Sequence, residues 1–446
     1  MIRLVHVIKD NKFINSTYEV FNSLSRTDLI CKYVFITQDR QYTFKNLKEI
    51  VSSIDVLHES EFLDYLNQNS TNAIMLHGLN LVDTLPYINN SIKIFWFAWG
   101  YDIYSYPSHN PFIPLKLYKP LTKRYSRDTF LNQLRILHGK FDTLCKYKKI
   151  RRAISRIDYF SGIIPDEYML MKKNHYFKAK EVVFNYFSID DVSYDDIKQP
   201  YCGGNAIQVG NSANPTNNHI DLYKSISKLN LDNTKVYSFL SYSGPQFYIN
   251  NVEKYGEKFF GSNFVAITDF LSYSEYTKIV QECSVVVMGH IRQQAMGSIY
   301  TSIWLGCKVF LYEDSIAYKY LNRLGFLIFT IEKDLTKKGI ERTLSNAEKL
   351  YNRKKYLEGA IPILKKELTD NTITTKVIIT DMMNNENNYL KYFFPIKVSN
   401  IDSYYPEYVK LESEYQSIKT LFDLELNEPK NFIKYDSSII VEKEKS

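Results

Sequence analysis

The chain has 446 residues, of which 45% are apolar, and a net charge of +7. This length exceeds what one hydrophobic core usually serves, so we expect two domains. Five widely spaced cysteines without a C-x-x-C pair argue against a disulfide framework or a structural zinc site, and the first apolar run is too short for a signal peptide or a membrane span. A reducing cytoplasm is therefore the expected compartment.

The first half of the chain alternates between strand-like and helix-like patterns. Short apolar runs predict strands at residues 2–8, 33–36, 73–76 and 92–97. Helical periodicity lies between them, for example at residues 45–54 and 59–67. A basic helical region at 122–156 follows, with further apolar runs at 159–164 and 181–184. This alternation is typical of a parallel sheet with crossover helices.

An acidic, loop-like linker at residues 190–200 precedes a second pattern of the same kind. Apolar runs predict strands at residues 205–209, 234–240, 264–267, 285–288 and 308–311. We therefore expect an α/β protein with two Rossmann-like domains, residues 1–195 and 196–375, whose parallel sheets face an interdomain cleft that holds the ligand. Residues 376–446 have weak periodicity and are expected to be a C-terminal extension, partly helical and partly disordered.

Residues 116–156 are the most basic part of the chain. They hold thirteen Lys or Arg residues against only Asp128 and Asp142, and apolar side chains alternate with the cations. This pattern suits an anionic membrane surface. The expected membrane contacts are Lys148, Lys149, Arg151 and Arg152. A solvated helix face whose apolar side packs in the core explains the pattern equally well, and nucleic acid is not an expected partner because no recognised binding module accompanies the charge.

A first polar motif, V-G-N-S-A-N-P-T-N-N-H, runs from Val209 to His219. It follows a predicted strand, and its turn offers backbone N–H groups near a helix start, where a phosphate can bind. The candidate binding residues are Gly210, Asn211, Ser212, Asn218 and His219. The structural alternative is an ordinary strand-to-helix loop with Asn caps and a packed histidine.

A second and more specific motif, G-H-I-R-Q-Q-A-M-G, runs from Gly289 to Gly297. Arg292 presents planar donors that match the oxygens of a diphosphate, and Gln293 and Gln294 could fix a ribose, a sugar hydroxyl or an acetamido group. The candidate binding residues are His290, Arg292, Gln293, Gln294 and Gly297. A solvent-facing helix N-terminus is the structural alternative.

Two weaker candidates lie between the motifs. Ser241 and Asp269 each follow a predicted strand, in the segments S-Y-S-G and T-D-F-L. They could form walls around a base or a phosphate.

Two strand ends in the first half carry candidate catalytic groups. Strand 92–97 runs into W-G-Y-D, which places Asp102 beside aromatic residues, and strand 73–76 runs into His77. Because neighbouring parallel strands end at one edge of a sheet, both groups can face the same cleft, and either could deprotonate an acceptor hydroxyl. The structural alternatives are a core histidine at 77 and a helix N-cap at 102.

Together, the V-G-N-S-x-x-x-x-N-N-H and H-x-R-Q-Q-x-x-G motifs and the H-G-L and W-G-x-D strand ends resemble glycosyltransferase family 56, the 4-alpha-L-fucosyltransferases. The resemblance extends over about residues 1–370 and is strongest at 209–306. It implies a GT-B fold and transfer of a deoxyamino sugar, 4-acetamido-4,6-dideoxygalactose (Fuc4NAc), from a TDP-sugar to a polyprenyl-diphosphate-linked oligosaccharide in the synthesis of an enterobacterial common antigen-like polysaccharide. It also implies a peripheral protein on the cytoplasmic face of the inner membrane, and it gives the matching residues of both motifs a role in binding the nucleotide sugar.

No cofactor or metal ion is expected beyond the donor. No isolated D-x-D follows a predicted strand, and the resemblance implies that Arg292 and backbone N–H groups stabilise the departing diphosphate while a base of the first domain activates the acceptor. Two other functions stay open: a GT-B-like nucleotide-sugar epimerase, which needs no acceptor lipid, and a non-catalytic membrane-surface scaffold that retains the fold.

Overall fold

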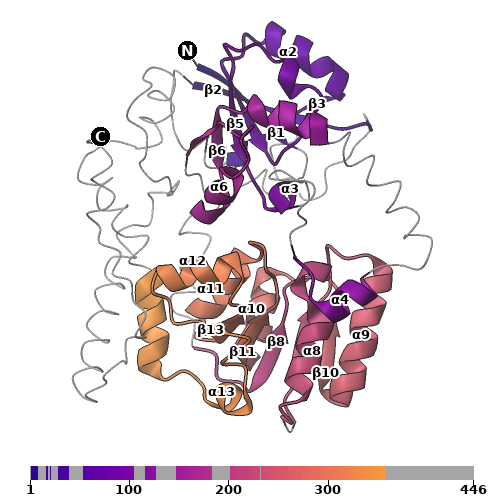
Figure 1. Ribbon diagram of the computed structural model, residues 1–446, viewed down its shortest axis with the longest axis vertical. Coiled ribbons are helices and arrows are strands. Elements are labelled where there is room, and N and C mark those ends of the chain that lie inside the picture. The colour runs from indigo at the N-terminus through magenta and orange to yellow at the C-terminus, as the bar shows by residue number, and fades with distance from the viewer. Residues whose placement is uncertain are drawn as a thin grey trace. The chain divides into compact units, whose positions relative to one another are not determined.

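The computed structural model describes residues 2–8, 17–18, 21, 29–39, 54–104, 116–126, 147–182, 201–231 and 233–356 (Figure 1). These residues form two units. Unit 1 contains the described residues up to 104 and those from 147 to 182, and unit 2 contains residues 116–126 and the described residues from 201 to 356. The expected C-terminal extension at 376–446 lies outside the described residues.

Unit 1 is built on a parallel sheet whose strand order, in the part of the chain that is described, is β3-β2-β1-β4-β5-β6-β7. The strands are β1 (Ile2–Ile8), β2 (Leu29–Ile36), β3 (Ile54–Leu57), β4 (Ala73–His77), β5 (Lys93–Phe97), β6 (Tyr159–Ser161) and β7 (Lys180–Glu181). The helices are η2 (Glu59–Glu61), α2 (Phe62–Gln68), η3 (Leu85–Tyr87), α3 (Tyr101–Tyr104), a helix at residues 147–155 and α6 (Pro165–Met171). The order reverses between β1 and β4, and ligands of such sheets bind at the carboxyl ends of the strands beside this reversal.

All four strands predicted in the first half are confirmed, and the helix expected at 59–67 is present as η2 and α2. The helix expected at 45–54 is wrong at its last residue. Ile54 begins strand β3 and pairs with Tyr33 of β2, because the sheet continues one strand further than the apolar pattern indicated. Residues 45–53 lie outside the described residues.

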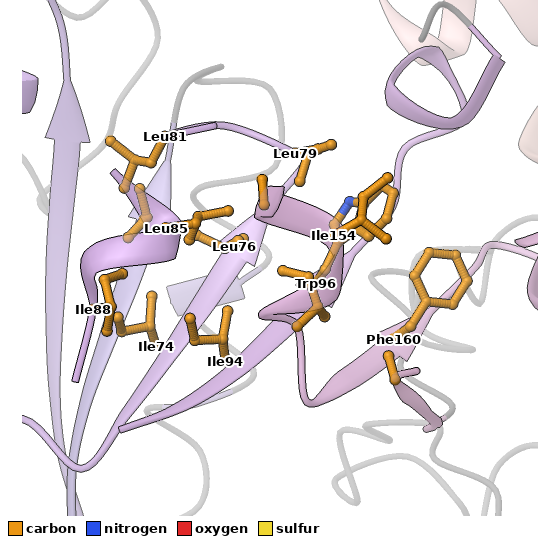
Figure 2. Close-up of a cluster of buried hydrophobic side chains, with 14 of the residues drawn as sticks. Ile74, Leu76, Leu79, Leu81, Leu85, Ile88, Ile94, Trp96, Ile154 and Phe160 are labelled. Atoms are coloured by element: carbon orange, nitrogen blue, oxygen red, sulfur yellow. The ribbon is translucent and has the colours of Figure 1, made fainter. Parts of the chain in front are cut away.

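The main core of unit 1 covers one face of this sheet (Figure 2). Side chains alternate across a strand, so Ile74 and Leu76 of β4 share this face with Ile94 and Trp96 of β5. The Trp96 ring is fully buried and meets the ring of Phe160 edge-on, with centroids 4.9 Å apart. Leucine and isoleucine side chains from the segment between β4 and β5, and from the helix at 147–155, cover the cluster.

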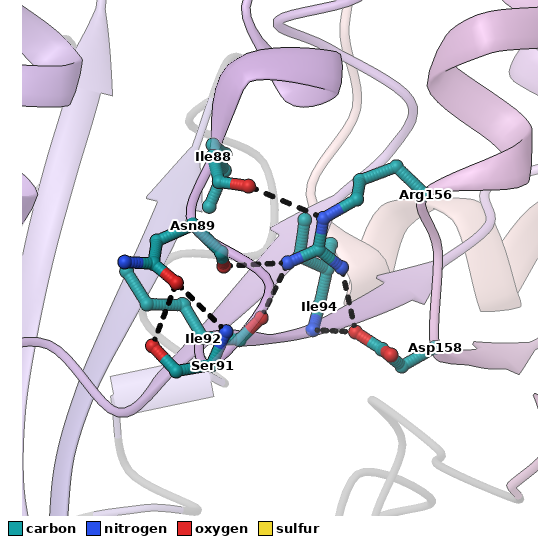
Figure 3. A network of polar contacts seen from close by, with 7 residues as sticks. All are labelled: Ile88, Asn89, Ser91, Ile92, Ile94, Arg156 and Asp158. Carbon is teal, nitrogen blue, oxygen red and sulfur yellow. Dashed lines mark hydrogen bonds and ion pairs between the residues drawn. The ribbon is translucent and has the colours of Figure 1, made fainter.

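A network of hydrogen bonds and one ion pair connects the turn before β5 with the residues just before β6 (Figure 3). The Arg156 guanidinium donates to the backbone carbonyls of Ile88, Asn89 and Ile92 at 3.4, 2.7 and 2.8 Å. It also pairs with the carboxylate of Asp158 at 3.0 Å, which accepts a hydrogen bond from the N–H of Ile94 at 2.8 Å. One cation of the basic segment is therefore used to hold the sheet together.

Unit 2 has a parallel sheet whose order among the described residues is β10-β9-β8-β11-β12-β13. The strands are β8 (Ala206–Val209), β9 (Val236–Phe239), β10 (Phe264–Ile267), β11 (Cys283–Met288), β12 (Lys308–Leu311) and β13 (Phe329–Thr330). The helices are α4 (Pro120–Tyr125), η5 (Pro215–Asn217), α8 (His219–Ser227), α9 (Gln246–Phe260), η6 (Gly261–Asn263), α10 (Tyr273–Glu282), α11 (Met296–Trp304), α12 (Ile316–Arg323) and α13 (Lys337–Glu341). All five strands predicted in this half are confirmed. The order of this sheet reverses between β8 and β11, and ligands of such sheets bind where the strands beside the reversal end.

Residues 116–126 belong to unit 2 although they precede β8 by many residues (Figure 1). Helix α4 lies against α8, where the carboxylate of Asp221 accepts hydrogen bonds from the N–H groups of Leu121 and Thr122 at 3.0 and 2.7 Å. These contacts satisfy two donors at the N-terminus of α4. The sequence analysis expected one domain boundary near residue 195, whereas residues 116–126 belong to unit 2. The expected basic helical region at 122–156 is therefore divided between α4 in unit 2 and the helix at 147–155 in unit 1.

Candidate functional site

The first motif forms the turn from β8 to α8. Gly210 has a φ of +71°, and a Cβ atom there would lie 2.6 Å from Nε2 of His219, so the turn requires glycine. The His219 ring is fully buried with Nδ1 3.2 Å from the hydroxyl of Tyr248. Burial lowers the pKa of His219 to about 3. These features agree with the structural alternative given for His219, a neutral histidine packed in the core.

Asn218 has the left-handed backbone conformation, with a φ of +54°. Its side-chain amide donates to the backbone carbonyls of Leu117, Thr216 and Gly289 at 3.1, 3.1 and 2.7 Å. Its side-chain oxygen accepts a hydrogen bond from the N–H of Lys119 at 2.8 Å. Protein groups thus satisfy this side chain, which joins residues 116–119 to both motifs.

The second motif leads from β11 into α11, whose N-cap Ala295 has a φ of +58° and offers no side-chain cap. Gln294 is buried and connects the two motifs. Its Nε2 donates to Oδ1 of Asn211 at 3.0 Å, and its Oε1 accepts from the hydroxyl of Thr216 at 2.6 Å. An α-helix without a side-chain cap leaves N–H groups that attract an anion, so the N-terminus of α11, beside the connected motifs, is a candidate anion site.

His290 and Arg292 stand just before this helix. His290 is fully buried, and neither ring nitrogen has a hydrogen-bond partner in the described part of the chain. Burial and the charge of Arg292 lower the pKa of His290 to about 3, so it offers one donor and one acceptor without charge. Arg292 is partly buried and donates to the carbonyl of Gln293 at 3.4 Å. This cation and the helix N-terminus both add positive potential in the segment between β11 and α11.

Of the remaining unit 2 candidates, Ser241 and Asp269 lie in loops after strands and Gly297 lies in the first turn of α11. Ser241 is half-buried after β9, and Asp269 is exposed after β10. Gly297 is exposed, and a Cβ atom there would meet nothing within 4 Å, so the protein itself does not require glycine at 297. Gly289 does have a close neighbour, because a Cβ atom there would lie 2.2 Å from the carbonyl oxygen of Asn217.

In unit 1, Asp102 is fully buried and accepts three hydrogen bonds, from the N–H of Leu79 at 2.9 Å, the indole N–H of Trp96 at 2.7 Å and the N–H of Trp99 at 2.9 Å. Burial raises the pKa of Asp102, and these three bonds oppose that shift. The carboxylate thereby joins the segments that follow β4 and β5. This is a structural role, as in the N-cap alternative that the sequence left open, but with more distant partners.

His77 is also buried, with Nε2 3.0 Å from Nδ1 of His6 on β1. Burial lowers the pKa of His77 to about 3. The pKa of His6 is held well below its usual value by burial and by electrostatic interaction with His77. The ring of His6 stacks on Tyr33 with centroids 4.7 Å apart. The structure thus pairs two neutral histidines on β1 and β4, the strands between which the order of this sheet reverses.

Sequence reasoning missed His6 and a second buried acid, Glu167. Glu167 is fully buried at the start of α6, where its Oε2 accepts from the N–H of Ile163 at 2.8 Å. Burial raises its pKa to about 8, and the nearby carboxylate of Asp102 adds to the shift. A polar residue inside the apolar run L-V-H-V-I was the available signal for His6, whereas nothing in the local pattern marked Glu167 as buried.

The four expected membrane contacts lie on the helix at 147–155, whose apolar side packs in the core of unit 1. Lys149 pairs with Asp83 at 2.9 Å. Arg151 lies over the ring of Tyr176 and donates to its hydroxyl. Lys148 and Arg152 are exposed.

Two kinds of feature are absent from the described part of the chain. No group of three His, Cys, Asp or Glu side chains is placed to hold a metal ion there. No helix among those residues has the length and the apolar content needed to span a bilayer.

Comparison with known proteins bears on the fold and on the motifs. The model of the family described as 4-alpha-L-fucosyltransferase, glycosyl transferase group 56, matches residues 140–355, which include both polar motifs. This match confirms the resemblance found in the two polar motifs, and the H-G-L and W-G-x-D strand ends lie outside the matched residues.

Among solved structures, the fold is similar to a trehalose-6-phosphate protein from E. coli bound with UDP-2-fluoro glucose, with a TM-score of 0.59 and 10% identity over 86% of this chain and 99% of that one. It is also similar to sucrose-phosphate synthase from Thermosynechococcus elongatus, with a TM-score of 0.55 and 7% identity over 83% of this chain and 100% of that one. At identities this low, the similarity is evidence of the fold alone. That fold is the GT-B fold of glycosyltransferases. The fold and the family match together identify the chain as a GT-B glycosyltransferase, related through residues 140–355 to the 4-alpha-L-fucosyltransferases of group 56.

Proposed function

We propose that the chain transfers 4-acetamido-4,6-dideoxygalactose from a TDP-sugar to a polyprenyl-diphosphate-linked oligosaccharide of an enterobacterial common antigen-like polysaccharide. The family match supports the class of sugar. The observation that carries the nucleotide-sugar part is the cluster before α11, where Arg292 adjoins the buried side chains of His290, Gln293 and Gln294 at a helix N-terminus without a side-chain cap.

The chemistry of this cluster suits the departure of a nucleoside diphosphate. Negative charge grows on the leaving diphosphate as the glycosidic bond breaks, and Arg292 together with the first N–H groups of α11 stabilises that charge. The neutral imidazole of His290 cannot contribute charge, but it can hydrogen-bond an uncharged hydroxyl or acetamido group. In this proposal the donor needs no metal ion, and turnover persists in the presence of a chelator.

Asp102 and His77 are the candidate bases for the acceptor hydroxyl. The raised pKa of Asp102 makes it the stronger base, although its oxygens already accept three donors. His77 carries a lowered pKa and is paired with His6. The burial of both groups means that the acceptor reaches them only if the surrounding side chains move, so kinetics of single variants must decide between them.

The first experiment measures thermal stabilisation of the protein by TDP, UDP, GDP and CMP. A ligand present at a hundred times its dissociation constant should add about 2.7 kcal/mol of stability. We expect TDP to stabilise most, the effect to be lost in Arg292→Ala, and the exposed control Lys224→Ala on α8 to behave as the unsubstituted protein. Stabilisation by UDP or GDP instead would overturn the TDP donor while leaving the fold in place.

A second measurement tests transfer itself. The protein is incubated with the TDP-sugar, with and without a polyprenyl-diphosphate-linked oligosaccharide, in the presence of a chelator. Sugar should move to the lipid-linked acceptor only when the acceptor is present. Conversion of the TDP-sugar without acceptor would favour an epimerase, and loss of turnover with the chelator would contradict metal independence.

A further inference from the structure

Two aromatic side chains are exposed in the loops that follow β9 and β10. Tyr242 is 39% exposed, and Phe270 is 84% exposed, the highest value of any large apolar side chain in the described residues. Exposing a phenyl ring to water forgoes the free energy of burying it. Such a ring at the ligand edge of a sheet calls for an explanation other than packing.

The two loops start side by side. Strands β9 and β10 are parallel and pair Phe239 with Ile267 at their last residues. The N–H of Leu240 donates to the carbonyl of Ile267 at 2.7 Å, so the pairing continues to the point where the loops diverge. Tyr242 and Phe270 are therefore each three residues beyond the ends of adjacent strands.

Tyr242 is also tied to the anion site at α11. Gln294 donates to Oδ1 of Asn211 at 3.0 Å, and Nδ2 of Asn211 donates to the hydroxyl of Tyr242 at 3.1 Å. The N–H of Ala213 donates to the carbonyl of Tyr242 at 2.9 Å, and a Cβ atom on Gly244 would lie 2.3 Å from the carbonyl oxygen of Ala213. The loop after β9 is thus held close against the first motif, and the position of Tyr242 relative to α11 is fixed.

The spacing of the strands gives the separation between the two ends of this edge. Neighbouring strands lie about 4.8 Å apart, so β9 is about 10 Å and β10 about 14 Å from β11 across the sheet. This is comparable with the extent of a nucleoside diphosphate from its terminal phosphate to its base. Charge orients the ligand along the edge, because Arg292 stands at the β11 end and the exposed carboxylate of Asp269 stands beside Phe270 at the β10 end.

We infer that Tyr242 and Phe270 form a stacking platform for the nucleobase of the donor, which lies along the carboxyl edge of the unit 2 sheet with its diphosphate at α11 and its base at β9 and β10. The inference rests on the proposed function, since it assumes that a nucleotide sugar binds at α11. Every base has a π-face that stacks on an aromatic ring, so the platform contributes affinity to any nucleotide, while the carboxylate of Asp269 repels a phosphate from this end.

The test compares TDP with inorganic pyrophosphate, which has the diphosphate charge and no base. Affinities are measured by isothermal titration for the unsubstituted protein and for Phe270→Ala, Tyr242→Ala, Tyr242→Phe and Arg292→Ala. Leu324→Ala is the matched control, because Leu324 is an exposed apolar side chain at the far end of α12. Phe270 is 84% and Leu324 45% exposed, so neither substitution removes a side chain from a hydrophobic core.

We expect Phe270→Ala and Tyr242→Ala each to weaken TDP by about tenfold and to leave pyrophosphate within about twofold. Tyr242→Phe keeps the ring and should bind TDP nearly as the unsubstituted protein does, and Arg292→Ala should weaken both ligands. If the unsubstituted protein binds TDP and both alanine variants bind it equally well, the platform is wrong and the proposed function stands. Equal losses for TDP and pyrophosphate would also overturn the platform. If the unsubstituted protein binds neither ligand, the proposed function fails and the platform fails with it.

Discussion

Glu167 shows how one buried residue can make stability depend on pH. Its pKa is raised from 4.5 to about 8, mainly by burial. Between these values the folded protein keeps a proton that the unfolded chain has released, so folding takes up a proton. The sign follows: the free energy of unfolding falls as pH rises through this window, and the contribution of Glu167 is most favourable at the acidic end.

We predict that Glu167→Gln flattens this dependence. The amide cannot ionise, so the variant should lose less stability than the unsubstituted protein when pH rises from about 5 to about 8. Thermal unfolding across that range measures the difference, with Glu257→Gln on the exposed face of α9 as the control. An unchanged slope in Glu167→Gln would mean that another group causes the dependence.

Asp102→Asn separates a catalytic from a structural role at the second residue of α3. An amide has one oxygen instead of two, so at least one of the three donors to Asp102 loses its acceptor, at a cost of about 1–3 kcal/mol. If Asp102 is also the base, turnover should fall by roughly a hundredfold or more, with little change in TDP affinity. Steady-state kinetics and a melting curve on the same sample give both quantities. A lower melting temperature with an unchanged rate would shift the role of the base to His77.

At the scale of elements, α4 depends on a side chain from α8. Helix α4 has six residues, too few to be stable alone, and Asp221 accepts hydrogen bonds from its first N–H groups. We predict that Asp221→Ala destabilises the docked helix by about 1–2 kcal/mol, the cost of losing a helix cap. Hydrogen exchange should show faster exchange at Lys123 and Ser126, whose N–H groups bond to carbonyls at 2.8 Å, and stabilisation by TDP should be retained.

Lys224→Ala on the exposed side of α8 is the matched control for that variant. Unchanged exchange rates in Asp221→Ala would show that the apolar contacts of Leu121 and Tyr125 hold α4 without the carboxylate.

The elements that sequence reasoning predicted are those with a self-sufficient local signal. Strands β10 and β12 contain short apolar runs between polar segments, and their limits were predicted to the residue. Strands β3 and β13 were missed. In β3, I-D-V-L, Asp55 interrupts the apolar run, and β13 has only two residues, so both depend on pairing with a neighbouring strand.

The same distinction applies to the candidate site. That both motifs lie at the same edge of the sheet was predictable, because each follows a predicted parallel strand. That they meet depends on the strand order, which places β8 next to β11. The structural role of Asn218 was not predictable, since its partners include Leu117 and Lys119, about a hundred positions earlier. The burial of Glu167 likewise follows from tertiary packing.

At the scale of the whole molecule, the basic segment divides between the two units. Only part of its charge is available to a membrane, because Arg156 holds a turn, Lys149 pairs with Asp83 and Arg151 lies over Tyr176. Substituting only Lys148 and Arg152, which are exposed, therefore tests membrane binding more specifically than substituting all four expected residues.

We predict that Lys148→Glu with Arg152→Glu weakens binding to anionic vesicles by at least about tenfold, since each basic residue near such a surface contributes about 1 kcal/mol. Vesicle sedimentation measures the effect, and TDP affinity should not change. Lys224→Glu with Lys228→Glu reverses two exposed charges, one on α8 and one at its C-terminal cap, and controls for net charge. If both double variants bind anionic vesicles equally well, the helix at 147–155 does not face a membrane.

The docking of α4 on α8 sets an order of events during synthesis of the chain. Thr122 precedes its partner Asp221 by 99 residues, and Leu117 precedes Asn218 by 101. At about 5–20 residues per second, a ribosome makes α4 roughly 5–20 seconds before the surface that holds it exists. During that interval a six-residue basic helix has no partner that could keep it folded. The nascent chain must therefore carry this segment undocked, and unit 2 is completed only when the chain returns to residues synthesised long before.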